Sequence, residues 1–340
     1  MAKSDKLTFG VIGAGRIGQL HARHLSYRVA RAKLIMISDI VEKAARQCAQ
    51  ECQVAQYGTD YHDILNDPDI QAVLICSSTD THAQIIEEAA LAGKHIFCEK
   101  PIDHDLGRID RALAAVDRAG VLLQVGFNRR FDANYQRVRK AVESGEIGEP
   151  HLMHIISRDP GPPPIEYIKV SGGIFLDMTI HDFDMARFLI GSEVEEVYVA
   201  GAVRVDPAIA EAGDLDTVMI TLKFANGVIA TIDNSRKAVY GYDQRVEIFG
   251  SKGCISTANN YPNTATVQTK DNVRHDLPLN FFMDRYVDSY LEEINQFLKA
   301  VLNNSPPPVS GIDGRIPVVM ARSARKSYEE NRPVRLDEVE

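Results

Sequence analysis

The chain has 340 residues, of which 45% are hydrophobic and 25% are charged, and its net charge at pH 7 is -9. These values are typical of a globular protein of about two domains and exclude a disordered or fibrous chain. The acidic balance disfavours nucleic acid or an anionic membrane as a partner and favours a small molecule.

The first residues run directly into an apolar strand pattern, without the hydrophobic segment and cleavage site of a secretory signal. No stretch reaches the roughly 18 continuous apolar residues of a membrane span. The five cysteines are odd in number and form no CxxC pair, so we expect free thiols and neither a disulfide framework nor a metal site. These features predict a cytoplasmic protein without a membrane partner.

The first 126 residues alternate short β-branched runs with longer helical patterns, as βαβ units around a parallel sheet do. Strands are expected at residues 7–12, 34–38, 72–76, 95–98 and 122–125. Helical patterns at residues 81–92 and 106–119 end at Gly93 and Gly120, since glycine is common just past a helix end. We therefore predict a doubly wound α/β Rossmann domain at residues 1–126.

A glycine-rich motif, GAGRIG at residues 13–18, follows the first expected strand, and a helical pattern begins within it. Gly13 permits the tight turn, and Gly15 allows the backbone to approach a pyrophosphate. The amide groups at the helix start, Arg16 and Ile17, would attract that anion. The motif alone is weak evidence, but its place between a strand and a helix predicts dinucleotide binding.

Asp39 ends the second expected strand, which is where an acidic residue is expected in this fold. Its carboxylate can accept hydrogen bonds from the adenosine ribose hydroxyls and would repel a 2′-phosphate. The next residue is Ile40 rather than an arginine, so the sequence favours NAD over NADP. The same carboxylate also fits the N-cap of a helix at residues 41–52.

Beyond residue 126 the hydrophobic pattern becomes strict alternation, as at residues 218–224, which is typical of a half-buried antiparallel strand. An α+β domain with a large open, mainly antiparallel sheet is predicted at residues 127–340. One sheet face is expected to pack on the helix that carries Asp177, and the other on another subunit. The further strands are expected at residues 194–205, 228–233, 245–249 and 264–268, and helices that brace the domain junction at residues 286–302 and 315–330.

Asp177 and His181 stand four residues apart in a stretch whose apolar spacing suggests a helix. At that spacing the side chains share one surface, where a carboxylate can orient an imidazole for proton transfer near neutral pH. The pair by itself also fits a surface hydrogen bond. Of the other histidines, His21 and His24 lie on the first expected helix and are given little weight.

Two further motifs are CEKP at residues 98–101 and GGIFLDMTIH at residues 172–181. Here the chain resembles the Gfo/Idh/MocA oxidoreductase family, whose cofactor domain carries EKP and whose second domain carries GGxxxDxxxH. The resemblance spans nearly the whole chain, and related enzymes oxidise various cyclic polyols and sugars. The segments most similar to inositol 2-dehydrogenases are GFNRRFD at residues 126–132, PGPPP at 160–164, MTIHDFDMAR at 178–187 and YGYDQR at 240–245.

The resemblance implies an NAD-dependent dehydrogenase that oxidises myo-inositol to its 2-keto product, scyllo-inosose. His181 would be the general base that takes a proton from a ring hydroxyl, as hydride passes to C4 of the nicotinamide. Asp177 would orient His181, and Lys100 would donate to the same hydroxyl. Lys100 also fits the usual fate of a solvated or salt-bridged lysine. The resemblance further implies a cis bond before Pro101 and a homotetramer that forms through the C-terminal sheet.

By the same resemblance, Arg130, Asp184 and Tyr240 would line the substrate site. Each has an alternative that the sequence leaves open. Arg130 could cap or pair with Asp132, and Asp184 could form a salt bridge with Arg187. Tyr240 could serve packing alone.

On the cofactor side, the resemblance implies contacts from Ser78, Thr79, His82 and Glu99. Ser78 and Thr79 would meet the nicotinamide ribose, although relatives often have asparagine near Thr79. His82 is equally well explained as part of a helix N-terminus.

Two rival functions remain open. One is a dehydrogenase of another cyclic polyol or an aldose, such as scyllo-inositol or glucose. The other is a regulator that senses a dinucleotide without turnover. A sensor has no need to keep Lys100, Asp177 and His181 together, so the sequence favours an enzyme.

Overall fold

The computed structural model describes residues 6–339, and the chain divides into two compact units. The N-terminal unit consists of residues up to 128 together with residues 288–316, and the C-terminal unit of residues 129–287 and 317–340. We expected all of residues 127–340 to form the second domain. Residues 288–316 instead group with the first unit, because a helix in this segment contributes Ile294, Phe297 and Leu298 to its core.

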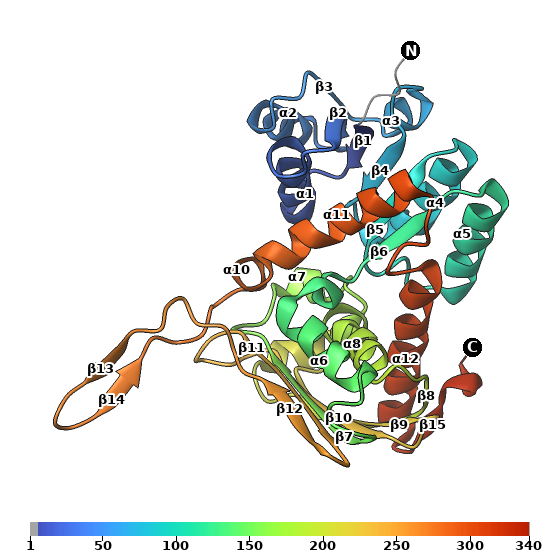
Figure 1. The fold of residues 1–340 in the computed structure, drawn as a ribbon. Helices are drawn as coiled ribbons and strands as arrows, with labels where there is room; N and C mark the ends of the chain where they lie inside the picture. The colour runs from blue at the N-terminus through green and yellow to red at the C-terminus, as the bar shows by residue number, and fades with distance from the viewer. Residues whose placement is uncertain (1–5, 340) are drawn as a thin grey trace. The chain divides into compact units, whose positions relative to one another are not determined.

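A six-stranded parallel sheet forms the centre of the N-terminal unit, with strand order β3-β2-β1-β4-β5-β6 (Figure 1). This is the predicted doubly wound Rossmann arrangement. Strand β3 was not predicted, because its three residues are largely exposed and show no apolar run. The strands are β1 (Leu7–Ile12), β2 (Ala32–Ser38), β3 (Gln56–Gly58), β4 (Ala72–Ile75), β5 (His95–Glu99) and β6 (Leu123–Gly126).

Helices cover both faces of this sheet. One core combines strand residues such as Phe9 and Leu74 with Leu25, Cys48 and Phe297 from three helices, α1, α2 and α11. Helices α4 and α5 pack on each other. The helices of the unit are α1 (Arg16–Tyr27), α2 (Glu42–Glu51), α3 (His62–Asn66), α4 (Thr79–Leu91), α5 (Leu106–Ala119) and α11 (Val287–Asn303).

The bounds of α5 agree with the prediction, and local interactions explain them. The Asp105 side chain accepts a hydrogen bond from the backbone N–H of Arg108 at 2.9 Å, which caps the helix start. Gly120 ends the helix with φ 66°, a left-handed conformation that glycine adopts readily.

A seven-stranded sheet forms the C-terminal unit, with strand order β12-β11-β7-β10-β9-β8-β15. The neighbours β7 and β10 run parallel, and the other pairs run antiparallel, so the sheet is mainly antiparallel as predicted. The strands are β7 (Pro150–Arg158), β8 (Val194–Ala202), β9 (Thr217–Phe224), β10 (Ile229–Ser235), β11 (Asp243–Gly250), β12 (Gly253–Thr257) and β15 (Val334–Arg335).

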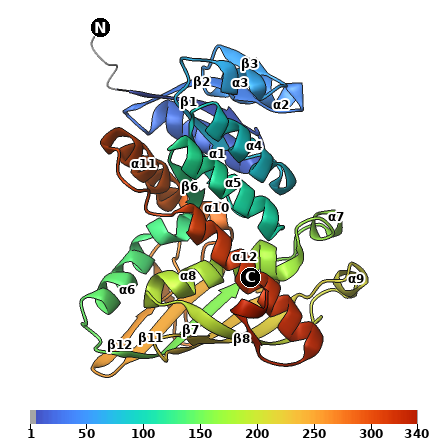
Figure 2. The same ribbon diagram turned by 90° about the vertical axis from the view of Figure 1, so that its right-hand side faces the viewer.

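Figure 2 shows helices α6, α8 and α12 on one face of this sheet. The alternation of the strands turns their apolar side chains, such as Ile220 and Leu222, toward these helices. The expected packing of the sheet on the helix around Asp177 is therefore confirmed. The helices of the unit are α6 (Ala133–Glu143), α7 (Ile165–Ile168), α8 (Ile180–Ile190), α9 (Pro207–Glu211), α10 (Phe282–Arg285) and α12 (Gly311–Glu330), whose residues before Pro317 group with the N-terminal unit.

The strand expected at residues 264–268 does not join the seven-stranded sheet. It forms β13 (Thr266–Gln268), which pairs with β14 (Val273–His275) in a separate hairpin that extends away from the main sheet (Figure 1). All residues of both strands are exposed, so they offer no apolar face to a core.

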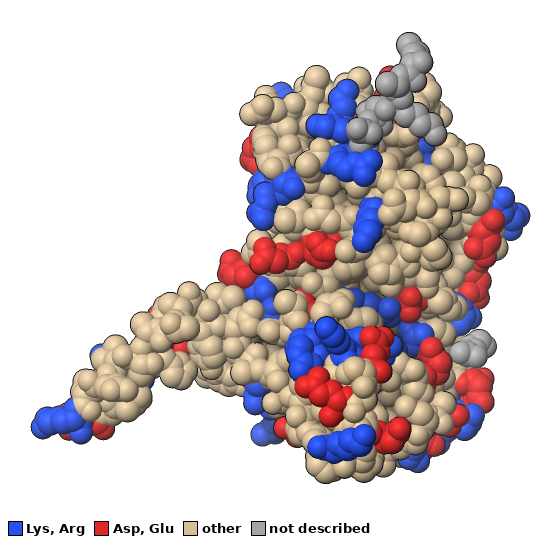
Figure 3. All heavy atoms as spheres, viewed as in Figure 1, with Lys and Arg blue, Asp and Glu red and all other residues tan. Residues whose placement is uncertain are grey.

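The surface in view in Figure 3 carries basic and acidic side chains on each unit, with both signs scattered over it. Between residues 6 and 339, no helix is both long and apolar enough to span a bilayer.

Candidate functional site

The glycine-rich loop after β1 has the conformation that dinucleotide binding requires. Gly13 has φ 97°, which favours glycine, and a Cβ at Gly18 would lie 1.9 Å from the carbonyl oxygen of Gly13. At Gly15 an added Cβ would meet no atom within 4 Å, so the backbone there is open to a ligand. Arg16 and Ile17 begin α1, and their amides lie at its N-terminus.

Asp39 lies beside this loop, at the carboxyl end of β2. Its Oδ2 accepts a hydrogen bond from the backbone N–H of Ala14 at 2.7 Å, and its Oδ1 accepts one from Val41 at 2.8 Å. The N-cap of α2 is Val41, so the alternative reading of Asp39 as that cap is wrong. The open backbone at Gly15 and the adjacent carboxylate fit the pyrophosphate and the ribose of NAD.

His82 connects the loops that follow β4 and β5. Its ring is 2% exposed, with Nδ1 2.9 Å from the carbonyl oxygen of Pro101 and Nε2 3.0 Å from that of Ser77. Both ring nitrogens thus lie at hydrogen-bond distance from backbone carbonyl oxygens, and the side chain joins the two loops. Ser78 and Thr79 lie at the N-terminus of α4, and Ser78 is exposed.

Glu99 and Lys100 stand where β5 ends, at the carboxyl edge of the parallel sheet where such folds bind ligands. The bond between Lys100 and Pro101 is cis, which confirms the expectation. The carboxylate of Glu99 contacts Nε2 of His21 at 2.7 Å.

In the C-terminal unit, two glycines prepare the turn that carries Asp177. Gly172 and Gly173 have φ 83° and 79°, and a Cβ at Gly173 would lie 2.7 Å from Oδ1 of Asp214. That oxygen accepts a hydrogen bond from the backbone N–H of Ile174 at 2.9 Å. The paired glycines of the motif thus let Asp214 approach and anchor the chain just before the helix.

Asp177 lies in a π-helical turn, Phe175–Thr179, that leads into α8. Such turns often occur at functional sites. Its Oδ2 accepts a hydrogen bond from Nη1 of Arg236 at 3.0 Å, and its Oδ1 accepts one from the Tyr167 hydroxyl at 3.0 Å. Arg236 is fully buried and also lies 3.5 Å from Oδ2 of Asp214. One guanidinium therefore fixes the carboxylate four residues before His181.

His181 is half-buried at the start of α8, and the residues around it tie this helix to its surroundings. Asp182 is fully buried and accepts hydrogen bonds from Nη1 of Arg129 at 2.7 Å and from Nδ2 of Asn234 at 2.9 Å. Asn234 accepts a further bond from the Thr179 hydroxyl at 2.6 Å. Burial raises the pKa of Asp182, and the charge of Arg129 opposes that rise.

The carboxyl of Asp159 is a further acidic group near Asp177. Burial raises its pKa from 3.8 to about 6, the positive charge of Arg236 opposes the rise, and the negative charge of Asp177 adds to it. A carboxyl group with a pKa of about 6 changes protonation just below neutral pH. Nothing in the sequence around Asp159 indicated this property.

Arg130 and Asp184 bind each other. Nη2 of Arg130 lies 2.6 Å from Oδ1 of Asp184, Nε lies 3.0 Å from both carboxylate oxygens, and the two side chains are buried. Asp132 pairs with Arg285, so the alternative pairing of Arg130 with Asp132 is wrong. Arg187 pairs with Glu193.

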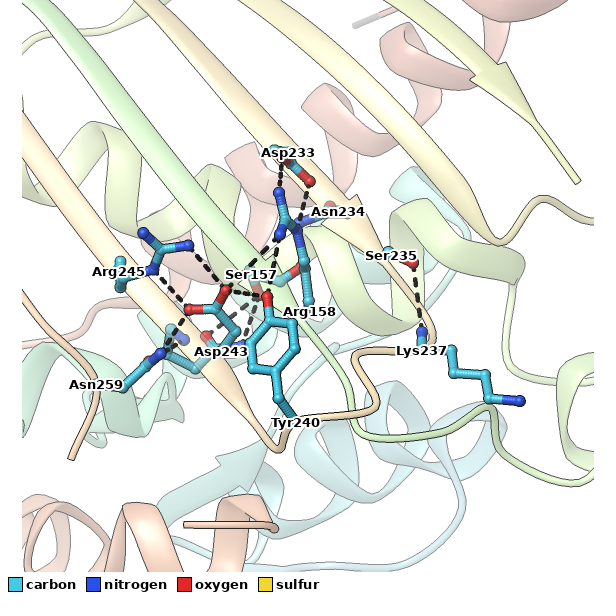
Figure 4. Close-up of polar contacts among 11 residues, drawn as sticks. Ser157, Arg158, Asp233, Asn234, Ser235, Lys237, Tyr240, Asp243, Arg245 and Asn259 are labelled. Atoms are coloured by element: carbon cyan, nitrogen blue, oxygen red, sulfur yellow. Dashed lines mark hydrogen bonds and ion pairs between the residues drawn. The ribbon is translucent and has the colours of Figure 1, made fainter. Parts of the chain in front are cut away.

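Tyr240 belongs to a cluster on the sheet face opposite the helices (Figure 4). Its hydroxyl donates to Oδ2 of Asp243 at 2.6 Å and accepts from Nη1 of Arg158 at 3.1 Å. Arg158 also pairs with Asp233. The structure thus groups Tyr240 with the outer face of the sheet and does not bring it to His181 on α8 within one chain.

Arg236, Asp214 and Asp159 are the residues of this region that sequence reasoning missed. No local motif marks them, because Arg236 reaches Asp177 across 59 positions of sequence. The glycine pair at Gly172 and Gly173 was the one available signal, since it indicated a close approach by another part of the chain.

Two family models match this chain. "Oxidoreductase family, NAD-binding Rossmann fold" matches residues 7–127, and "GFO/IDH/MocA C-terminal domain" matches residues 135–256. A protein of Thermotoga maritima named myo-inositol 2-dehydrogenase is 49% identical over 98% of this chain and 99% of its own.

Solved structures are similar over nearly the full chain. A probable dehydrogenase from Thermotoga maritima is 49% identical, with a TM-score of 0.97 over 98% of this chain and 100% of its own. A scyllo-inositol dehydrogenase from Lactobacillus casei, with bound NAD(H) and scyllo-inositol, is 30% identical, with a TM-score of 0.91 over 98% of this chain and 99% of its own. The chain therefore belongs to the Gfo/Idh/MocA family of NAD-binding oxidoreductases.

Proposed function

We propose that this protein oxidises myo-inositol to scyllo-inosose with NAD as the cofactor. The observation that carries the proposal is the carboxylate of Asp177, fixed by Arg236 in the π-helical turn before His181. The substrate class follows from the similarity to proteins named inositol dehydrogenases over nearly the whole chain.

In this proposal His181 is the general base that accepts the proton of the reacting hydroxyl. Asp177, held by Arg236 and Tyr167, orients the imidazole and stabilises its charged form. Lys100 donates a hydrogen bond to the reacting oxygen and stabilises the developing carbonyl.

NAD, when bound, supplies the hydride acceptor. The glycine loop and the start of α1, with Gly13, Gly15, Arg16 and Ile17, would hold its pyrophosphate, and Asp39 its adenosine ribose. Ser78, Thr79 and Glu99 are proposed to contact its nicotinamide half. No metal ion is required for these steps.

The roles of Arg130, Asp184 and Tyr240 in substrate binding stay predictions. Arg130 and Asp184 present a neutralised, buried ion pair, so we expect them to shape the site as a unit. Tyr240 would reach a substrate only from the outer face of the sheet.

The test is an initial-rate assay of NADH formation over a panel of inositol isomers and aldoses. His181→Ala is expected to lower kcat by at least about 100-fold, the contribution of a positioned general base, and to leave NAD affinity nearly unchanged. His151→Ala, at an exposed histidine on β7, is the matched control and should keep full activity. Near wild-type kcat in His181→Ala would refute the base assignment, and no turnover of any inositol would refute the substrate.

The principal alternative substrate is scyllo-inositol, because a protein with that substrate in its name aligns over 98% of this chain. The same panel distinguishes it, since the preferred isomer should show the highest kcat/KM. Glucose or another aldose is the next candidate.

We propose further that the protein forms a homotetramer through the outer face of the C-terminal sheet. Leu152, Met219, Ile229 and Phe249 point outward on neighbouring strands and are 44–51% exposed, which is unusual for large apolar side chains on one face. Sedimentation analysis should give a tetramer, and Met219→Glu with Phe249→Glu should yield smaller species. The five cysteines are all free thiols, which supports the proposed cytoplasmic location.

A further inference from the structure

Three ionisable side chains meet inside the N-terminal unit. They are His21 from α1, Glu99 from the end of β5 and Glu293 from α11. His21 and Glu293 are fully buried, and the Glu99 side chain is 13% exposed. Nε2 of His21 lies 2.7 Å from Oε1 of Glu99 and 3.8 Å from Oε1 of Glu293.

Glu293 stands out in this cluster because neither of its carboxylate oxygens accepts a hydrogen bond from any residue between 6 and 339. A buried carboxylate without such partners is strongly disfavoured in its charged form. Burial raises the pKa of Glu293 well above its ordinary value, and the negative charge of Glu99 raises it further. The neutral, protonated acid is the form that this environment favours.

Within residues 6–339, the basic side chain that lies beside the Glu293 carboxylate is the imidazole of His21, with Nε2 3.8 Å from Oε1. Burial lowers the pKa of His24, behind His21, to about 4, so that ring is neutral at pH 7. Burial also raises the pKa of Cys76, so its thiol carries no charge. The titratable groups that face the site are His21 and His24 from α1, Cys76 after β4, Glu99 from β5 and Tyr290 from α11.

The three ligand atoms lie within 4.8 Å of one another, so a bound cation is the competing reading. Two observations oppose it. The 2.7 Å contact between His21 and Glu99 is a hydrogen bond, with no room for an ion between the two atoms. Metal-bound histidines also donate their second ring nitrogen to a partner, whereas Nδ1 of His21 is buried and has none within the described chain.

We propose that Glu293 carries a proton at neutral pH and that, together with His21, it holds the carboxylate of Glu99 in place. His21 donates through Nε2, and the carboxylic acid of Glu293 supplies the second donor. Since Glu99 directly precedes Lys100, His21 and Glu293 are positioning residues for the segment that carries Lys100. This consequence for catalysis rests on the proposed function, but the protonation of Glu293 does not.

The proposal fixes the sign of a pH effect on stability. A folded-state pKa above the unfolded value makes the folded state bind a proton that the unfolded state has lost. Stability then falls as pH rises from about 4.5 to the folded-state pKa of Glu293. Beyond that pKa, two anions face each other within 4.8 Å, and the segment at Glu99 is expected to loosen.

The first experiment compares thermal unfolding of the full chain with that of Glu293→Gln between pH 5 and pH 9. Glutamine is neutral and nearly isosteric, so the variant should be more stable than the wild type at pH 8 and gain little at pH 5. The Tm difference between Glu293→Gln and the wild type should grow by roughly 2–4 °C for each pH unit above the ordinary pKa of a glutamate, until the folded-state pKa of Glu293 is reached. Glu292→Gln, at the half-exposed neighbour that binds Gln296, is the matched control and should show no such trend.

Infrared difference spectroscopy provides an independent measurement. At pH 7 the spectrum of the wild type minus that of Glu293→Gln should show the carbonyl stretch of one protonated carboxyl group. An equal Tm difference between Glu293→Gln and the wild type at pH 5 and at pH 8, or no such band, would overturn the protonation of Glu293. A Tm that falls on treatment with EDTA and recovers with a divalent cation would also overturn it, in favour of a metal site.

The positioning role is tested by kcat. Glu293→Met removes the donor and should lower kcat by about tenfold, the equivalent of one hydrogen bond, and Glu293→Gln should restore most of that loss. The alkaline fall of kcat should also move to higher pH in Glu293→Gln. Equal kcat in the Met variant and the wild type would refute the positioning role. Absence of inositol turnover in the wild type would refute the proposed function alone, because Tm and the infrared band do not depend on it.

Discussion

The fully buried guanidinium of Arg236 offers the sharpest test of how the C-terminal site is built. In Arg236→Met, the carboxylates of Asp177 and Asp214 lose their shared cation, and their side chains are only 15% and 5% exposed. Removing one partner of a buried ion pair costs about 3–5 kcal/mol. Because Asp177 keeps its hydrogen bond from Tyr167 and some exposure, we expect about 3 kcal/mol, or roughly 6–12 °C in Tm.

A second substitution separates this explanation from a simple packing defect. Asp214→Asn alone should destabilise the protein, since it weakens the pair with Arg236. In the Arg236→Met background the same change should stabilise it, because it removes a stranded charge and still leaves an oxygen for the N–H of Ile174. Arg335→Met is the control, since Arg335 forms an exposed pair with Asp337 and its loss should change stability little.

Stability would be measured by urea and thermal denaturation followed by circular dichroism, and activity by NADH formation. Displacement of Asp177 should lower kcat by about 100-fold, the usual effect of a misplaced catalytic group. NAD affinity should be unchanged and is measured by calorimetry, because the chain has no tryptophan for fluorescence. A loss below 1 kcal/mol in Arg236→Met, or no reversal of sign for Asp214→Asn, would refute the reasoning.

Three further predictions concern the N-terminal unit. Gly15→Ala should leave Tm within about 1 °C of the wild type but weaken NAD binding. Gly18→Ala should lower Tm by several degrees, because its Cβ would lie 1.9 Å from the carbonyl oxygen of Gly13. Similar Tm values for both variants would contradict this. Asp39→Ala should raise the KM for NAD by about 10–100-fold, which corresponds to the loss of one or two charge-assisted hydrogen bonds. The same variant should use NADP better than the wild type does. Unchanged cofactor preference in steady-state assays would argue against the ribose contact. Burial lowers the pKa of His24 from 6.5 to about 4, so the contribution of this group to stability is complete above pH 6.5 and is lost as pH falls toward 4. Between pH 6.5 and pH 4 the wild type should therefore lose up to about 3 kcal/mol relative to His24→Gln in unfolding curves. Equal pH dependence in the two proteins would count against the assignment.

The sequence by itself determined most of the local structure. Periodicity placed β1 and α5 at their observed bounds, and it separated the parallel from the mainly antiparallel sheet. The glycine motif and Asp39 could be predicted because their roles depend on backbone conformation and on their places after the first and second strands. The hairpin β13–β14 was placed in the wrong sheet, because pairing partners are not a local property.

Only the tertiary structure decided which buried charges meet. Arg130 binds Asp184 rather than the nearby Asp132, and Glu293 approaches Glu99 from a segment that the chain reaches near its end. Sequence spacing favours partners one helical turn away, whereas a buried charge is compensated by whichever group the topology brings to it. The motif residues can therefore be recognised from the sequence, whereas the partners that hold them are determined by the packing of distant segments.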